Sequence, residues 1–207
     1  MTSLANLPLH EVVNRVAAPS PTPGGGTVTA ITGALGAALA EMVASLPRTR
    51  RNAADEREAL DLVRPALAAA RARLETLADL DTGAFDRLLA ARRRPRDTDA
   101  ATAARQLAIV AATKDATLVP LETARLCADV LKLVETVAGA GHRAAASDLF
   151  VAIALVRAAA EGAASSARAN LETLDDPAFV AASIRRISAT LDDVTRSAHT
   201  GLGLLQG

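Results

Sequence analysis

The residues of this sequence best suited to bind a ligand form a glycine-rich turn that leads directly into an apolar helix. Gly24, Gly25, Gly26 and Thr27 follow three closely spaced prolines. Glycines let backbone N–H groups approach a ligand without side-chain obstruction, and a helix N-terminus adds unpaired donors and a partial positive charge. A carboxylate or phosphate would fit such a turn. Alternatively, the turn is a tight helix-to-helix connection with Thr27 as N-cap.

Two aspartates are the candidate acid–base residues. Asp81 begins a short helical pattern and Asp148 follows Ser147 at a predicted helix start, although N-cap and helix-dipole roles would explain both placements. Arg168 and Asn170 form a polar group at the far end of the helix that contains Asp148. Asp148 and Asn170 are about 33 Å apart along this helix, so they cannot share a site within one chain. Either two ligand regions exist, or an antiparallel partner subunit brings opposite ends together.

The composition argues against several other classes of function. The 23 basic residues balance the 23 acidic ones, which disfavours a general affinity for nucleic acid or acidic lipid. A single cysteine, Cys127, and three scattered histidines predict no intramolecular disulfide and no metal site. The N-terminus lacks the features of a signal peptide, and the most apolar stretch, 28–40, is shorter than the about 20 residues of a membrane span. We therefore expect a cytoplasmic protein with no tightly bound cofactor and a buried core helix at this stretch.

The elements that must position these residues are all predicted to be helices. The chain has no Trp or Tyr, only three Phe, and many small helix formers. Periodicity and chain breakers predict helices over 9–17, 27–46, 53–80, 82–94, 98–116, 120–139, 144–170 and 178–199. Pro65 is expected to kink or split the third, and a polar turn is expected over 47–52. The sequence therefore predicts an all-α fold, one bundle of seven or eight helices formed by a single domain, 1–207.

Small residues indicate close packing of helices. Gly33 and Gly36, with neighbouring alanines, leave a smooth face that another helix can approach. Nearly every predicted helix also carries more Ala and Leu than one facing stripe requires, which suggests that a partner chain buries a second side. We therefore expect a homodimer.

The motifs, in order, resemble those of a known family. The stretch 20–46, with Pro-Thr-Pro-Gly-Gly-Gly-Thr-Val and then Gly-Ala-Leu-Gly-Ala-Ala-Leu-Ala-Glu-Met-Val-Ala, resembles the opening of the cyclodeaminase and methenyltetrahydrofolate cyclohydrolase family. This family includes the C-terminal domain of formiminotransferase-cyclodeaminase. The resemblance continues through 81–85, 119–121, 146–152 and 162–171, and so covers nearly the whole chain.

The resemblance implies an all-α dimeric enzyme that acts on one-carbon tetrahydrofolates without a metal or redox cofactor. Members either hydrolyse 5,10-methenyltetrahydrofolate to the 10-formyl form or cyclise 5-formiminotetrahydrofolate with loss of ammonia. A positioned carboxylate could stabilise the cationic amidinium and relay a proton, so Asp81 and Asp148 are the catalytic candidates. The substrate-binding candidates are Gly24, Gly25, Gly26, Thr27, Ser147, Arg168 and Asn170.

The sequence departs from the family pattern at several positions near these candidates. Gly-His-Arg-Ala-Ala at 141–145 replaces the expected Gly-Asn-Pro-Asn-Ala, Phe150 replaces a Gly, and Ser166 replaces an Asn. A rival interpretation is therefore a catalytically altered folate-binding protein, or a helical interaction protein, on the same dimeric scaffold. The retained acids favour the enzyme, whereas the lost Asn side chains and the bulky Phe150 favour the rival.

Overall fold

The computed structural model describes residues 3–47 and 54–206, which form helices and no strand. The elements in chain order are the 3-10 helix η1 (Leu4–Asn6), α1 (Leu9–Ala17), α2 (Gly25–Ser45), α3 (Ala54–Arg92), α4 (Asp99–Ala140), the 3-10 helix η2 (Arg143–Ala145), α5 (Ala146–Leu171) and α6 (Pro177–Gln206). The predicted all-α fold is confirmed. Apart from Pro47, the turn predicted over 47–52 lies outside the described residues.

The predicted count of seven or eight helices is wrong, because the described residues form six α-helices. The segments 53–80 and 82–94 belong to one helix, α3, which runs through Pro65 without a break, and α4 likewise runs through Pro120. A proline inside a helix removes a hydrogen bond and introduces a clash that costs about 3 kcal/mol. Buried apolar residues lie on both sides of each proline, and their shared burial offsets that local cost.

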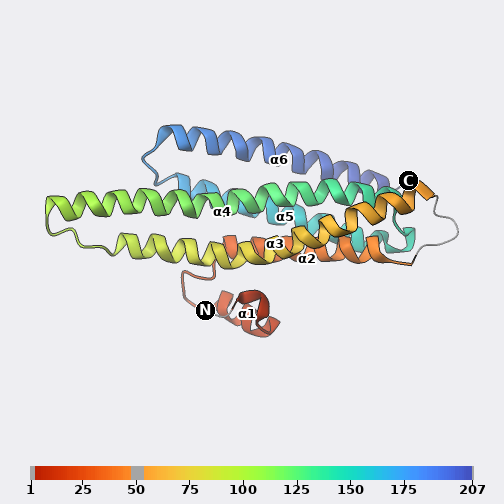
Figure 1. Ribbon diagram of the computed structural model, residues 1–207, viewed down its shortest axis with the longest axis horizontal. Coiled ribbons are helices and arrows are strands. Elements are labelled where there is room, and N and C mark those ends of the chain that lie inside the picture. The colour runs from red at the N-terminus through yellow and green to blue at the C-terminus, as the bar shows by residue number, and fades with distance from the viewer. Residues whose placement is uncertain (1–2, 48–53, 207) are drawn as a thin grey trace.

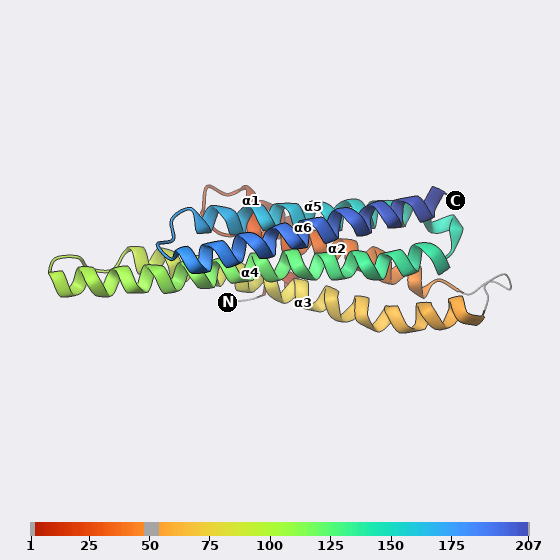
Figure 2. The same ribbon diagram turned by 90° about the horizontal axis from the view of Figure 1, so that it is seen from above.

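The helices form a bundle of three layers (Figures 1 and 2). Helix α6 lies on one side, α4 and α5 lie in the middle, and α2 and α3 lie on the other side. Consecutive helices from α2 to α6 are antiparallel. The α3–α4 hairpin extends beyond the ends of the other helices, and α1 stands away from the bundle below α2 and α3 in Figure 1.

Close helix contacts depend on the two glycines of α2 that the sequence singles out. A Cβ atom on Gly36 would lie 2.5 Å from Val156 Cγ2 of α5, and one on Gly33 would lie 2.9 Å from Cys127 Sγ of α4. The smooth face is therefore confirmed as a helix-packing device. Its use as evidence for a dimer interface is wrong, because both glycines are buried within the single chain.

Helix α4 tolerates Pro120 through a side chain from another helix. Pro120 has no N–H to donate to the carbonyl of Ala116, one turn earlier. Asn170 of α5 supplies the missing donor, because its Nδ2 lies 2.9 Å from the Ala116 carbonyl oxygen. This contact joins α4 and α5 at the level where α4 lacks its own hydrogen bond.

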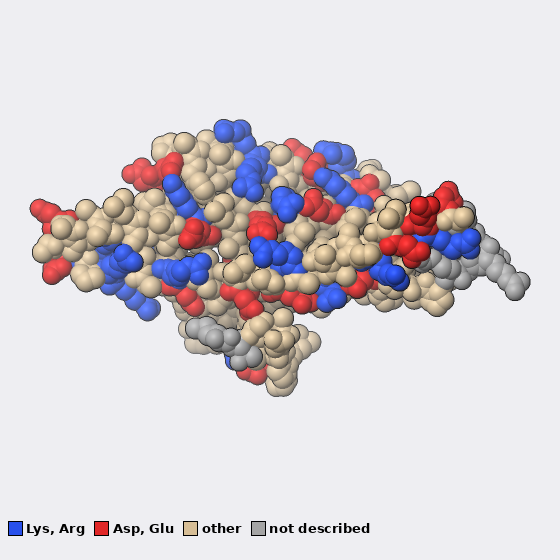
Figure 3. Space-filling view, viewed as in Figure 1, with Lys and Arg blue, Asp and Glu red and all other residues tan. Residues whose placement is uncertain are grey.

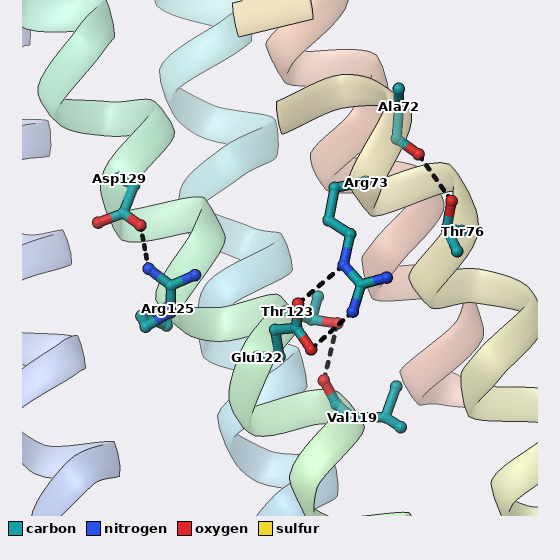
Figure 4. Close-up of polar contacts among 8 residues, drawn as sticks. All are labelled: Ala72, Arg73, Thr76, Val119, Glu122, Thr123, Arg125 and Asp129. Carbon is teal, nitrogen blue, oxygen red and sulfur yellow. Dashed lines mark hydrogen bonds and ion pairs between the residues drawn. The ribbon is translucent and has the colours of Figure 1, made fainter. Parts of the chain in front are cut away.

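Polar contacts on the surface join α3 to α4. Figure 4 shows Arg73 of α3 donating two hydrogen bonds, of 2.8 and 3.0 Å, to the carboxylate of Glu122 on α4. Exposed pairs of this kind contribute about 0.2–1 kcal/mol, so they fix helix register more than they stabilise the bundle.

Two stretches are long and apolar enough to cross a membrane by length and composition: Gly25–Ser45 and Arg143–Leu171. In the most apolar window of each, 50% and 44% of the residues are buried inside the bundle. The expectation that the apolar stretch around 28–40 is too short for a span is therefore wrong by length, whereas the buried core helix predicted there is confirmed. Each of the two stretches still leaves an apolar face that the chain itself does not cover.

The contact at Pro120 leads to a prediction about stability. Substituting Asn170→Ala leaves the Ala116 carbonyl without its donor, which should lower the free energy of unfolding by about 1–3 kcal/mol in urea titrations. In a Pro120→Ala background, residue 120 can donate its own N–H, so Asn170→Ala should cost less there. Equal costs in the two backgrounds would contradict this role of Asn170.

Candidate functional site

The glycine-rich turn forms the N-terminus of α2. Gly24 is the N-cap and has no side chain with which to cap the helix, which begins at Gly25. Thr27 lies inside the first turn, so its predicted alternative role as N-cap is wrong. Asp81 lies deep within α3 and begins no helix, so its predicted N-cap role there is wrong as well.

Asp81 meets the first turn of α2. Thr27 Oγ1 donates a hydrogen bond of 2.9 Å to Asp81 Oδ2. Thr27 Oγ1 also lies 3.0 Å from Thr82 Oγ1, and because the Thr27 proton is given to Asp81, Thr82 is the donor in that contact. The Thr27 side chain is completely buried, so both contacts satisfy a hydroxyl that has no access to water. Asp81 therefore caps α2 from a neighbouring helix.

The environment of Asp81 shifts its titration. Burial of the carboxyl raises its pKa, and the hydrogen bonds from the Thr27 hydroxyl and the Thr27 backbone N–H oppose this effect without cancelling it. A half-buried carboxyl with a raised pKa takes up a proton more readily than an ordinary aspartate, which suits a group that accepts and returns protons.

The glycines differ in what surrounds them. A Cβ atom on Gly26 would lie 2.7 Å from Asp81 Cγ, closer than real Cβ contacts, so Gly26 is required for Asp81 to reach the helix end. Gly25 is exposed, and a Cβ atom there would lie 3.8 Å from Ser166 Oγ of α5. The accessible part of the turn therefore faces the space between Gly25 and Ser166.

Asp148 lies at the opposite end of the bundle. It occupies the first turn of α5, about 27 Å along that helix from Ser166. Ser147 is exposed and is not the N-cap, because that position belongs to Ala145. Within one chain, the structure therefore separates Ser147 and Asp148 from Asp81, and the predicted separation of Asp148 from Asn170 along one helix is confirmed.

The remaining candidates lie at the same end as Asp81 but do not converge on it through any described contact. Asn170 donates to the Ala116 carbonyl of α4, which gives it a structural partner, and Arg168 is exposed. Sequence reasoning did not select Thr82, and it noted Ser166 only as a departure from the family pattern near the candidate residues. Their proximity to the turn depends on how α3 and α5 pack against α2, which residue spacing does not reveal.

Other features of the described residues lie outside this centre. No group of three or more His, Cys, Asp or Glu side chains in 3–47 and 54–206 is placed to hold a metal ion. A cavity of about 310 Å³ between α5 and α6 is lined by Phe150, Ile153, Ala154, Arg157, Ala158, Glu161 and Leu202. None of the candidate site residues lines it.

This geometry changes the ligand chemistry expected of the turn. The partial positive charge at the N-terminus of α2 is already met by the Asp81 carboxylate, which would compete with the carboxylate or phosphate predicted to bind the Gly24–Thr27 turn. A cationic group beside Asp81 would instead find a partner carboxylate that can also accept a proton.

Comparison with known proteins gives one consistent result. The family model described as formiminotransferase-cyclodeaminase matches residues 8–189. The methenyltetrahydrofolate cyclohydrolase of Methylorubrum extorquens is 34% identical over 186 residues, covering 90% of this chain and 89% of that protein. The crystal structure of formiminotetrahydrofolate cyclodeaminase from Thermotoga maritima superimposes with a TM-score of 0.88 at 27% identity and covers 98% of both chains.

A longer relative matches as well. The formimidoyltransferase-cyclodeaminase of Sus scrofa is 34% identical over 204 residues, which is 99% of this chain. The chain spans only 38% of the length of that protein. The activity of the longer protein as a whole therefore does not transfer to this chain.

The packing around the turn predicts opposite responses at adjacent glycines. Gly26→Ala forces the new methyl group into the Asp81 carboxylate, and overpacking of this kind costs about 1–3 kcal/mol. At Gly25 the new methyl group would lie 3.8 Å from Ser166 Oγ, an ordinary van der Waals contact, and Gly25→Ala gains helix propensity. In thermal denaturation, Gly26→Ala should therefore have a clearly lower Tm than Gly25→Ala, and equal Tm values would contradict the seating of Asp81 against Gly26.

Proposed function

The chain belongs to the formiminotransferase-cyclodeaminase family, and we propose that Asp81 is the acid–base residue of a one-carbon tetrahydrofolate reaction in this protein. The protein is a folate enzyme that either hydrolyses 5,10-methenyltetrahydrofolate to 10-formyltetrahydrofolate or cyclises 5-formiminotetrahydrofolate with release of ammonia. The observation that carries the assignment is the half-buried Asp81 carboxylate, held at the end of α2 beside an exposed glycine.

In the hydrolytic direction, Asp81 acts on a cationic substrate. The carbon that bridges N5 and N10 carries the amidinium charge, which the carboxylate stabilises. Water adds to this carbon while Asp81 accepts the proton that water loses. Asp81 then returns its proton to N5 as the carbon–N5 bond breaks, and the new hydroxyl loses its proton to solvent as its C=O bond forms, which leaves the formyl group on N10.

In the cyclising reaction, Asp81 again accepts a proton and then returns it. N10 attacks the carbon of the protonated formimino group and loses its proton to Asp81. Asp81 then returns this proton to the amino group on the tetrahedral carbon, which leaves as ammonia as its bond to carbon breaks and the methenyl cation forms. Both reactions need one group that accepts and returns a proton, and the raised pKa of Asp81 suits that group.

The substrate reaches this carboxylate past the glycine turn. Gly25 presents backbone without a side chain, and Ser166 provides a hydroxyl on the facing helix. Gly24, Gly26 and Thr27 shape the turn and hold Asp81. We keep Arg168 among the substrate-binding candidates because it is exposed at the same end of α5.

We propose that the protein acts as a homodimer through α2 and α5. Leu35 and Met42 of α2 and Phe150 and Val151 of α5 are exposed apolar side chains on two helices that pack side by side. The face formed by α3, α4 and α6 instead mixes Lys and Arg with Asp and Glu, as Figure 3 shows. Exposed apolar side chains on neighbouring helices, with charged residues on another face, support an interface between subunits on the apolar side.

A dimer of this kind gives Asp148 and Ser147 a place in the reaction. If the partner lies antiparallel across α2 and α5, its Asp148 end lies beside the Asp81 end of the first chain. Each site would then take Asp81 from one subunit and Asp148 from the other. The cytoplasmic location, the single domain and the lack of a tightly bound cofactor remain predictions from the sequence.

The proposed role of Asp81 predicts a specific loss of turnover. Asp81→Asn can still accept the Thr27 hydrogen bond, so the fold should survive, but the residue can no longer take a proton. The rate should fall about a hundredfold or more without a comparable loss of binding. Decay of the near-ultraviolet band of the methenyl form measures this rate, since the chain has no Trp or Tyr to interfere.

The pH dependence gives the same prediction a second readout. Asp81 acts as a base when ionised, so activity should fall on acidification with an inflection above the ordinary aspartate pKa of about 3.9. Because the folded state favours the protonated form, ionisation of Asp81 also lowers stability as pH rises from that ordinary value through the raised one.

Near wild-type activity in Asp81→Asn would remove Asp81 from the mechanism. A wild type inactive on both folates would favour the binding-only alternative.

The shared site predicts complementation between inactive chains. Asp81→Asn and Asp148→Asn should each have low activity as homodimers, whereas chains unfolded and refolded together should regain about a quarter of wild-type activity, because half of the dimers are mixed and each mixed dimer has one intact site. Light scattering should show about twice the 21.2 kDa chain mass for the wild type. Leu35→Glu should dissociate the dimer, whereas Leu62→Glu, on an exposed face of α3, should not. Absence of complementation would show that Asp148 does not act across subunits.

A further inference from the structure

Three aspartates of α3 each hold a different part of the N-terminal segment. Asp79 Oδ1 accepts from the Leu4 backbone N–H at 2.9 Å, Asp81 accepts from Thr27, and Asp86 Oδ1 accepts from Thr22 Oγ1 at 3.0 Å. Asp79 and Asp86 are two helical turns apart, about 10 Å along α3. Of these three aspartates of α3, the proposed reaction uses Asp81 alone. The contacts of Asp79 and Asp86 therefore need their own explanation.

The turn before α2 has little else to hold it against the bundle. From Ala5 to Gly26, Thr22 makes the one described hydrogen bond to another helix. Ser20 Oγ donates to the Thr22 carbonyl at 2.9 Å, which keeps the turn compact but does not attach it. Helix α1 contributes little anchoring, because Val12 is its one buried residue.

The Thr22 contact determines where the glycines lie. Thr22 is two residues before Gly24, and the Gly24 carbonyl accepts the first helical hydrogen bond of α2, from the Val28 N–H at 3.0 Å. The first residues of α2 are therefore held by carboxylates of α3 on both sides: Asp86 before the glycines and Asp81 after them. A shift of the turn at Thr22 would move Gly25 and Gly26 relative to Asp81.

We propose that Asp86 is a positioning residue, which fixes the Gly24–Gly26 turn against Asp81 through Thr22. Asp86 touches neither water nor substrate in the reaction described above; it acts through the geometry of the turn. The inference rests on the proposed function for its catalytic consequence, but the placement of the turn can be measured without any folate. Displacement of a catalytic constellation by about 1 Å is enough to reduce rates severely.

The kinetic test compares two anchors on one helix. Asp86→Ala and Thr22→Val should each lower kcat/KM about tenfold or more, and the double variant should be no worse than either, because both remove the same contact. Asp86→Asn retains an acceptor oxygen and should restore most of the activity. Asp79→Ala, which releases η1 but not the turn, is the matched control and should leave kcat and KM unchanged.

A second measurement separates this inference from the proposed function. In protein labelled with ¹⁵N-glycine, the amide resonances of Gly24, Gly25 and Gly26 should shift or broaden in Asp86→Ala and Thr22→Val, and stay unchanged in Asp79→Ala. This result would support the positioning of the turn even in a protein inactive on both folates. Unchanged glycine resonances would overturn the inference. Changed resonances with wild-type kinetics would overturn its catalytic consequence alone.

Discussion

The site depends on one constraint: the Asp81 carboxylate must lie against the backbone of Gly26 at the N-terminus of α2. A helix with glycine at its N-cap has no side chain of its own to satisfy its first N–H groups. Asp81 supplies that acceptor from α3, and the missing side chain at Gly26 leaves room for it. The same contact places a carboxylate in a half-buried position, which raises its pKa. Structural capping and the proposed acid–base chemistry would therefore share one side chain.

The bundle keeps that contact in place by fixing the register of α2 against its neighbours. Gly33 and Gly36 allow α4 and α5 to approach the helix backbone closely, and any sliding of α2 would bring side chains into those contacts. Packing of this kind has discrete arrangements, because a core at crystal-like density does not deform continuously. Because α2 is held rigidly, the turn at its N-terminus keeps the Asp81 carboxylate within hydrogen-bond distance of Thr27.

The sequence predicts local structure well where strong breakers mark it. The helix over 9–17 is confirmed residue for residue, and α2 begins within two residues of its predicted start, because proline and glycine clusters end the preceding segments. The helix boundaries predicted near Asp81 and near Pro120 are wrong, because α3 and α4 continue through these positions. Whether Pro120 breaks α4 depends on Asn170, 50 residues later, which no local pattern reveals. The same limit applies to the candidate site. The glycines and the aspartate can be chosen from the sequence by their residue types, but the hydrogen bond between Thr27 and Asp81 depends on the register of α2 against α3.

The position of Asp148 is the reason why we propose a functional unit larger than one chain. A bundle of long antiparallel helices places residues near the two ends of α5 far apart, and no movement within α5 can bring Asp148 to the Asp81 end. The apolar faces that α2 and α5 leave uncovered run between those ends. A two-fold axis across these faces would bury them and set the two ends side by side. The burial of apolar surface and the completion of the site would then follow from the same association.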